Sequence, residues 1–127
     1  MDSMSSSAAR LKQLQLRQRE LARQILDLGF VQQGSVVLRH TYCRTPGCRC
    51  HAERPQPHGP YWQWTRYDSG RTITRRLTER QAALYQEWIA NRRRLGDIIA
   101  EMEKVGEQAA KLMLEQTDPA PAASQST

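Results

Sequence analysis

Three cysteines lie within eight residues, at Cys43, Cys48 and Cys50, and this cluster restricts the fold of the chain more than any other feature. Pro46 and Gly47 interrupt the segment, so the backbone is able to turn back on itself. An odd number of thiols so close together is better explained by a metal ion than by disulfides, above all in a reducing compartment. Three cysteines and one histidine form one of the usual structural ligand sets of zinc. The cluster therefore predicts a structural Zn2+ site.

Three histidines are candidates for the fourth ligand: His40, His51 and His58. His51 directly follows Cys50, and neighbouring side chains seldom converge on one ion. His40 falls in an expected strand, where its side chain would face the core or solvent. His58 follows a proline-rich loop and precedes the next expected strand, so that a ligand there would tie the loop to the sheet. We choose His58 and leave the other two histidines open.

Amphipathic helices are predicted at both ends of the chain. Over residues 8–28 the apolar residues recur in alternating steps of three and four, and Gly29 is a typical helix stop. A second helix over residues 79–113 begins with a capping box formed by Thr78 and Gln81. Its apolar seam is longer than a small sheet needs. We expect it to pair with the first helix, with a second copy of the chain in a homodimer, or with both.

Residues rich in β-branched and aromatic side chains predict three strands between the helices, over 35–42, 61–67 and 71–77. The turn Asp68-Ser69-Gly70 joins the last two strands into a hairpin. The predicted fold class is α+β: an N-terminal helix, a zinc-pinned three-stranded antiparallel sheet and a long C-terminal helix.

We expect a single domain over residues 8–113, in which residues 35–77 form the zinc-binding β-module. The segments 1–7 and 117–127 lack apolar periodicity and are expected to be disordered. No apolar run reaches the length of a membrane span and no signal-peptide core is present, so we expect a cytoplasmic protein without a membrane partner.

The positive charge is concentrated in the middle of the chain. The chain has a net charge of +6, and residues 35–80 contain nine arginines and no lysine against three acidic residues. Because the planar arginine fork binds phosphate with two hydrogen bonds, this segment predicts a nucleic-acid-binding surface, although a merely solvated face is the alternative. The expected phosphate contacts are Arg39, Arg44, Arg49, Arg66, Arg71, Arg75 and Arg76.

Four aromatic residues alternate with polar residues directly after the proposed fourth ligand: Tyr61, Trp62, Trp64 and Tyr67. Such residues can stack nucleic-acid bases, but an aromatic stripe on a strand more often belongs to the core. We therefore expect at most one face of this strand to be free for stacking.

An enzymatic function is not expected. The segment His51-Ala52-Glu53 resembles the His-x-Glu of zinc deaminases, but the cysteines of that motif follow it, whereas here they precede it. Four protein ligands would also leave no position for an activated water. No nucleophile paired with a base and no pair of carboxylates is recognisable.

The order of these motifs resembles a family of short, uncharacterised prokaryotic proteins, formally a domain of unknown function. The resemblance covers roughly residues 34–105, from Cys43-Arg44-Thr45-Pro46-Gly47-Cys48-Arg49-Cys50 through His58-Gly59-Pro60-Tyr61 to the capped helix. It implies that Cys43, Cys48, Cys50 and His58 recur in the family, and that members often lie near transposases. His51 departs from the small or basic residue expected there, so its competition with His58 stays open.

We expect a non-enzymatic, zinc-stabilised protein that binds nucleic acid, with DNA favoured over RNA, or acts as an accessory protein of a mobile element. The alternative is a helical protein-interaction adaptor or homodimer, in which the zinc module is purely structural.

Overall fold

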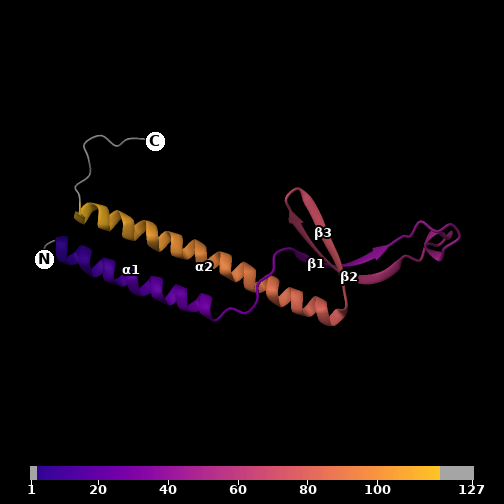
Figure 1. Ribbon diagram of the computed structural model, residues 1–127, viewed down its shortest axis with the longest axis horizontal. Coiled ribbons are helices and arrows are strands. Elements are labelled where there is room, and N and C mark those ends of the chain that lie inside the picture. The colour runs from indigo at the N-terminus through magenta and orange to yellow at the C-terminus, as the bar shows by residue number, and fades with distance from the viewer. Residues whose placement is uncertain (1–2, 118–127) are drawn as a thin grey trace. The chain divides into compact units, whose positions relative to one another are not determined.

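The computed structural model describes residues 3–117 of the 127-residue chain. Two long helices flank a three-stranded sheet in sequence (Figure 1), as the predicted α+β fold class requires. The elements in chain order are α1 (Ser3–Leu26), β1 (Ser35–Thr41), the 3-10 turn η1 (Arg49–His51), β2 (His58–Asp68), β3 (Arg71–Leu77) and α2 (Glu79–Thr117).

The chain packs as two compact units, and the single domain expected over residues 8–113 stays a prediction. The helical unit comprises the chain up to Leu28 and from Arg94 onward, and the sheet unit comprises Gly29–Arg93. Helix α2 is continuous and contributes to both units. Each unit has its own hydrophobic core, because the apolar seam of α2 meets the sheet along its first turns and α1 along the rest.

The helical unit is an antiparallel pair formed by α1 and the second part of α2 (Figure 1). Its buried core consists of Leu14 and Leu21 from α1 with Ile98 and Val105 from α2. Leu14 and Leu21 belong to the predicted apolar pattern of the first helix, whereas Ile98 and Val105 lie beside the apolar seam predicted for the second helix and not on it. Packing these four side chains together removes them from water. Neither helix in the described residues combines the length and the apolar character that a membrane crossing needs.

The observed helix ends differ from the predicted ones. Helix α1 begins at Ser3, so Ser5, Ser6 and Ser7 are helical although we had assigned them to a disordered segment. The physical reason is that each residue added to an existing helix gains a backbone hydrogen bond, which a small polar residue does not prevent. At the other end Leu26 is the last residue of α1, and α2 continues to Thr117, four residues beyond the predicted end. The remaining residues of both predicted disordered segments, 1–2 and 118–127, lie outside the described residues.

The sheet unit contains the antiparallel sheet in the order β1-β2-β3. One sheet face packs on the first turns of α2, and its buried core is formed by Trp64, Leu77 and Ala82. Trp62 packs against the same core and is half-buried. Strand β2 begins at His58, three residues before the predicted start, because Thr41 of β1 already pairs with His58.

Two local features fix the ends of the sheet. The indole nitrogen of Trp64 donates a 2.8 Å hydrogen bond to the carbonyl oxygen of Gln33. The next residue, Gly34, has φ +109°, and a Cβ there would lie 2.7 Å from the same indole nitrogen, so only glycine fits. At the other end the predicted capping box is confirmed, because the backbone amides of Thr78 and Gln81 each donate to the other's side chain at 2.9 and 3.1 Å.

Candidate metal centre

The loop between β1 and β2 brings three thiols and one imidazole together. The side-chain ligand atoms of Cys43, Cys48, Cys50 and His58 all lie within 4.8 Å of one another. The sulfur atoms of Cys43 and Cys50 are 3.5 Å apart, and Cys48 Sγ is 3.3 Å from His58 Nε2. In a tetrahedral site with Zn–S bonds of about 2.3 Å, two sulfur atoms stand about 3.8 Å apart and a sulfur and a nitrogen about 3.6 Å. These two pairs differ from the tetrahedral values by about 0.3 Å, and no pair of ligand atoms is more than 4.8 Å apart, so the four side chains could hold a metal ion after shifts of up to about 1 Å.

Strand pairing and one short turn position these four residues. Thr41 pairs with His58 across the β1–β2 ladder. Cys43 follows two residues after Thr41, so it lies close to the start of β2. Cys48 and Cys50 flank the start of η1, where the amide of His51 donates to the carbonyl oxygen of Cys48 at 2.8 Å. This tight turn directs two thiols separated by one residue toward the same point.

Cys50 is the most enclosed of the four candidate ligands. Its relative exposure is 1%, and the backbone amide of Cys43 donates to its sulfur atom at 3.3 Å. It is also the only buried residue between Tyr42 and Pro57. A loop with so little buried apolar surface has few interactions of its own to offset its conformational entropy, as in small domains that depend on a metal.

The thiols differ in their affinity for protons. A backbone hydrogen bond from Thr45, with smaller contributions from His58 and Cys48, lowers the pKa of Cys43 to about 5. Burial raises the pKa of the Cys50 thiol above its ordinary value. Because a metal ligand must be a thiolate, Cys43 is prepared for metal binding at neutral pH, whereas Cys50 must release a proton.

The other two histidines do not join the cluster. His51 Nε2 forms a hydrogen bond with the backbone carbonyl oxygen of Cys43. Its side chain thus links two parts of the loop but does not belong to the group of thiols and imidazole. His40 lies on β1 and is exposed. Of the three histidines, His58 is therefore the one that the fold brings close to the thiols.

The predicted phosphate-binding arginines do not form one patch. The loop between β1 and β2, residues 42–57, is here called the metal loop. Arg44 and Arg49 are exposed on this loop, next to Cys43 and Cys48. Arg39 of β1 and Arg76 of β3 lie on the sheet face opposite the core, on either side of Tyr61 of β2. The guanidinium carbon of Arg76 is 3.7 Å from the centre of the Tyr61 ring.

The remaining three arginines have other surroundings. Arg66 and Arg75 lie on the packed face, each with its guanidinium carbon 6.0 Å from the centre of the Trp64 ring. Arg66 also pairs with Asp68 at 3.6 Å, and Arg75 donates to the Tyr85 hydroxyl at 3.3 Å. Arg71 pairs in register with Asp68 beside the hairpin turn. The alternation of side chains along each strand predicts which residues share a face of the sheet. Only the packing shows which of the two faces α2 covers.

Two residues of this region were missed by sequence reasoning. His51 was considered only as a ligand, although it closes the loop through a backbone carbonyl. Arg54 lies exposed in the same metal loop and was not included among the phosphate contacts. Its position in an arginine-rich segment was a usable signal, whereas the hydrogen bond of His51 depends on a loop conformation that no sequence pattern specifies.

Much of the chain matches a known protein family. Residues 11–87 match the family described as "Domain of unknown function (DUF6788)", so the chain belongs to this family. The match extends from α1 through the metal loop and the sheet into the first turns of α2. Searches of curated proteins and of solved structures found no significant match.

Proposed function

We propose that this member of the DUF6788 family is a non-enzymatic nucleic-acid-binding protein whose arginine-rich loop is held by a structural zinc ion. The observation that carries the proposal is the separation of charge between the two units. The sheet unit has a net charge of +7, with eleven arginines, no lysine and four acidic residues. The rest of the chain has a net charge of −1, with eight basic and nine acidic residues.

Most of these arginines have no acidic partner. In the part of the sheet unit that the structure describes, Arg66 with Asp68 is the one ion pair within 4.0 Å. Exposed guanidinium groups without a carboxylate are free to bind an external anion, and their planar fork matches two phosphate oxygens. A surface of this kind supports phosphate recognition along a nucleic-acid backbone.

The metal loop supplies the positioned part of this surface. Arg44 follows Cys43, and Arg49 lies between Cys48 and Cys50. The set of three thiols and one imidazole fits zinc, which when bound would join four points of the loop and of β2. Because Arg44 and Arg49 adjoin these points, their backbone would be held in place without the residues themselves being ligands.

The sheet face opposite the core, here called the open sheet face, offers aromatic side chains for contact with nucleic-acid bases. Tyr61 and Gln63 of β2 lie on this face between Arg39 and Arg76, and Tyr67 is 72% exposed toward its end. Trp62 and Trp64 are occupied in the core, so base stacking is left to the tyrosines. DNA is favoured over RNA in this proposal, and a role beside mobile elements rests on the resemblance of the motifs alone.

The proposal is tested by measuring binding to short duplex DNA and to RNA of the same sequence, by fluorescence anisotropy over a series of salt concentrations. Replacing Arg44 and Arg49 together by glutamine should weaken binding to all sequences and reduce the salt slope for duplex DNA by about 1.8, since each lost phosphate contact contributes about 0.9. The control replaces Arg17 and Lys104 of the helical unit by glutamine, which changes the net charge equally.

Equal weakening by both pairs of substitutions would show that only net charge matters and would overturn the assignment to the metal loop. Binding that does not depend on salt, or no binding at low salt, would overturn the proposed function itself.

A further inference from the structure

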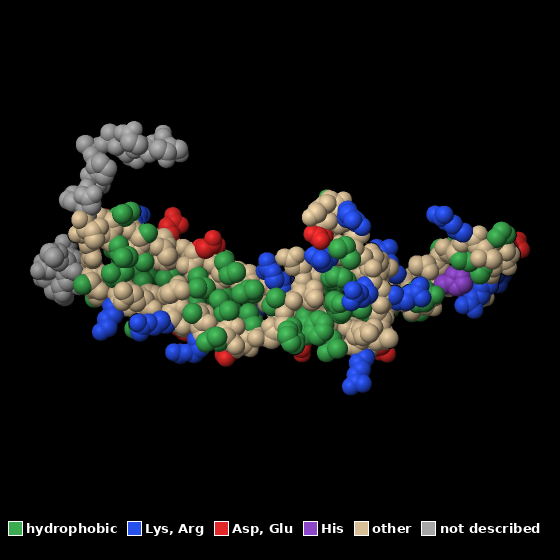
Figure 2. Space-filling model, viewed as in Figure 1, with side chains coloured by type: hydrophobic (Ala, Val, Ile, Leu, Met, Phe, Trp, Pro, Cys, Tyr) green, Lys and Arg blue, Asp and Glu red, His purple; other side chains and the backbone are tan. Residues whose placement is uncertain are grey.

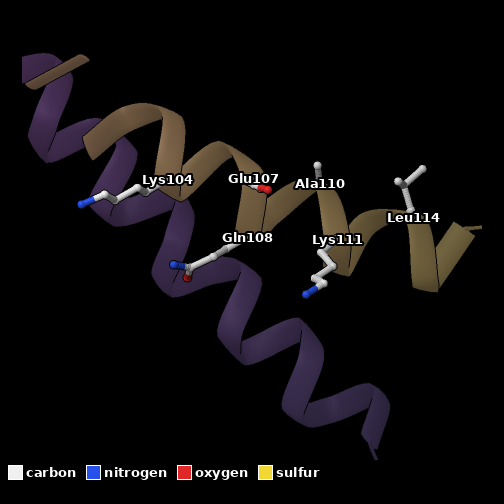
Figure 3. Close-up of a pocket in the computed structure, with 6 residues that line it drawn as sticks. All are labelled: Lys104, Glu107, Gln108, Ala110, Lys111 and Leu114. Carbon is white, nitrogen blue, oxygen red and sulfur yellow. The ribbon is translucent and has the colours of Figure 1, made fainter. Parts of the chain in front are cut away.

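The two open sides of the helical hairpin, along the line where α1 and α2 meet, differ in chemistry. One side has a 2.9 Å hydrogen bond from Arg10 of α1 to Gln108 of α2. Figure 3 shows Gln108 directed toward α1 on this side, while Ala110 and Leu114 project away from α1. Farther along the same line, Arg17, Asp97 and Glu101 surround a shallow hollow between the helices. Charged and amide groups therefore cover this side.

The other side is apolar and has a groove of about 440 Å³, lined by Gln15 and Arg19 of α1 and by Gly106 and Ala109 of α2, among others. Gly106 is open, because a Cβ there would meet no atom within 4 Å. Residues seven apart lie on one helix stripe, so Ile99 and Met113 continue the side of Gly106. Both are exposed, at 43% and 50%.

Helix α1 continues the apolar side in the same way. Leu26 lies seven residues after Arg19 and is 84% exposed. Ala22 lies seven residues after Gln15 and is half-buried. Apolar side chains thus form a stripe on this side of the hairpin, interrupted by the amides of Gln15 and Gln18. We call it the open stripe, formed by Ala22, Leu26, Ile99, Gly106, Ala109 and Met113.

Opposite charges border the open stripe. Along α1 the border is basic, with Lys12 and Arg19 seven residues apart and Arg23 one turn further. Along α2 it is acidic, with Glu103 and Glu107 one turn apart beside Gly106. Figure 2 shows hydrophobic side chains along the hairpin, with most of the Lys and Arg at the α1 edge and most of the Asp and Glu at the α2 edge. In the described residues, none of these five border residues forms an ion pair within 4.0 Å.

We propose that the open stripe is a dimer interface and that its occupant is the same stripe of a second copy of this chain. Two hairpins facing each other through this stripe form a four-helix bundle in which both apolar faces leave water. Charge decides the arrangement: the basic border of α1 meets the acidic border of the partner's α2, which requires a two-fold axis parallel to the helices. An axis perpendicular to them would bring like borders together and be repulsive.

Gly106 contributes to this fit because a residue without a side chain allows the partner helix to approach closely. Gln15 and Gln18 are able to hydrogen-bond across the interface and so favour one register over others. The dimer does not depend on nucleic-acid binding, because it uses none of the arginines of the sheet unit.

The test is sedimentation equilibrium of the full chain over a range of concentrations. Ile99→Glu combined with Met113→Glu should weaken dimerisation at least 100-fold. The matched control, Leu16→Glu combined with Ala100→Glu, adds the same two charges to exposed positions of the hairpin outside the stripe and should leave the dimer unchanged. Circular dichroism checks that both variants keep their helices.

A charge exchange tests the arrangement of the copies. Arg19→Glu and Glu103→Arg should each weaken the dimer, and the two together should restore it, because α1 faces the partner's α2. A chain that stays monomeric at every concentration overturns the proposal, and so does a dimer that responds equally to both pairs of glutamates. Failure to bind DNA or RNA would leave this result untouched, so the two proposals fail separately.

Discussion

Removal of the metal should release the loop between β1 and β2 while the rest of the sheet unit stays folded. Between Tyr42 and Pro57 only Cys50 is buried, whereas Trp64, Leu77 and Ala82 form a core that contains no residue of the loop. The order of the loop therefore depends on the metal ion that joins its residues, whereas the core of the sheet unit does not depend on the ion. We expect one zinc ion per chain and local disorder when it is chelated.

The size of the effect follows from linkage. An ion that binds only the ordered loop, present at about 1,000 times its dissociation constant, stabilises that loop by about 4 kcal/mol. Amide exchange in the loop should then be about 1,000-fold slower with metal than without it, since each ~1.4 kcal/mol corresponds to a factor of ten. The amides concerned are those with a loop hydrogen bond: Cys43, Cys48, His51, Ala52 and Gln56.

Hydrogen exchange followed by mass spectrometry, with and without a chelator, measures this difference. The amide of Ala82, which donates to the carbonyl oxygen of Thr78 at 2.8 Å, serves as an internal reference and should not change. His58→Ala should abolish the response to zinc, whereas His51→Ala, which removes only a hydrogen bond to a backbone oxygen, should keep the bound ion. Equal protection with and without metal would refute the reasoning, and so would a loss of protection that spreads to Ala82.

Two further predictions concern the helical core and the pH dependence of the metal centre. Leu21→Ala removes a side chain that is 2% exposed and should cost about 2–5 kcal/mol in urea unfolding, whereas Leu16→Ala at a 56% exposed position should stay within about 0.5 kcal/mol; similar costs would contradict the assigned core. Zinc affinity should fall as the pH is lowered from about 8 to about 6, by about tenfold per pH unit for each thiol that must lose a proton. Burial raises the pKa of Cys50, so this thiol contributes to the slope, while Cys43, with its pKa lowered to about 5, does not. Competition with a chromophoric chelator measures the slope, and an affinity independent of pH would contradict a ligand set that contains thiols which must release a proton.

The fold class and the clustering of the three cysteines could be predicted from the sequence because local rules control them. Strand β3 has the predicted bounds, and Thr78 with Gln81 forms the expected cap, since turn and capping residues act within a few positions of the chain. The three cysteines converge because one short turn and one strand end carry them.

The tertiary structure decided what depends on contacts between distant residues. Spacing alone left three histidines open, and the pairing of Thr41 with His58 brings one of them to the thiols. The charge pattern suggested one arginine surface, but the packing of α2 on one sheet face separates Arg39 and Arg76 from Arg66 and Arg75. The sequence alone thus determined which side chains are available for metal and phosphate, because composition and short-range spacing suffice for that. Their grouping was decided only by the fold, because strand register and helix packing determine which face each side chain occupies.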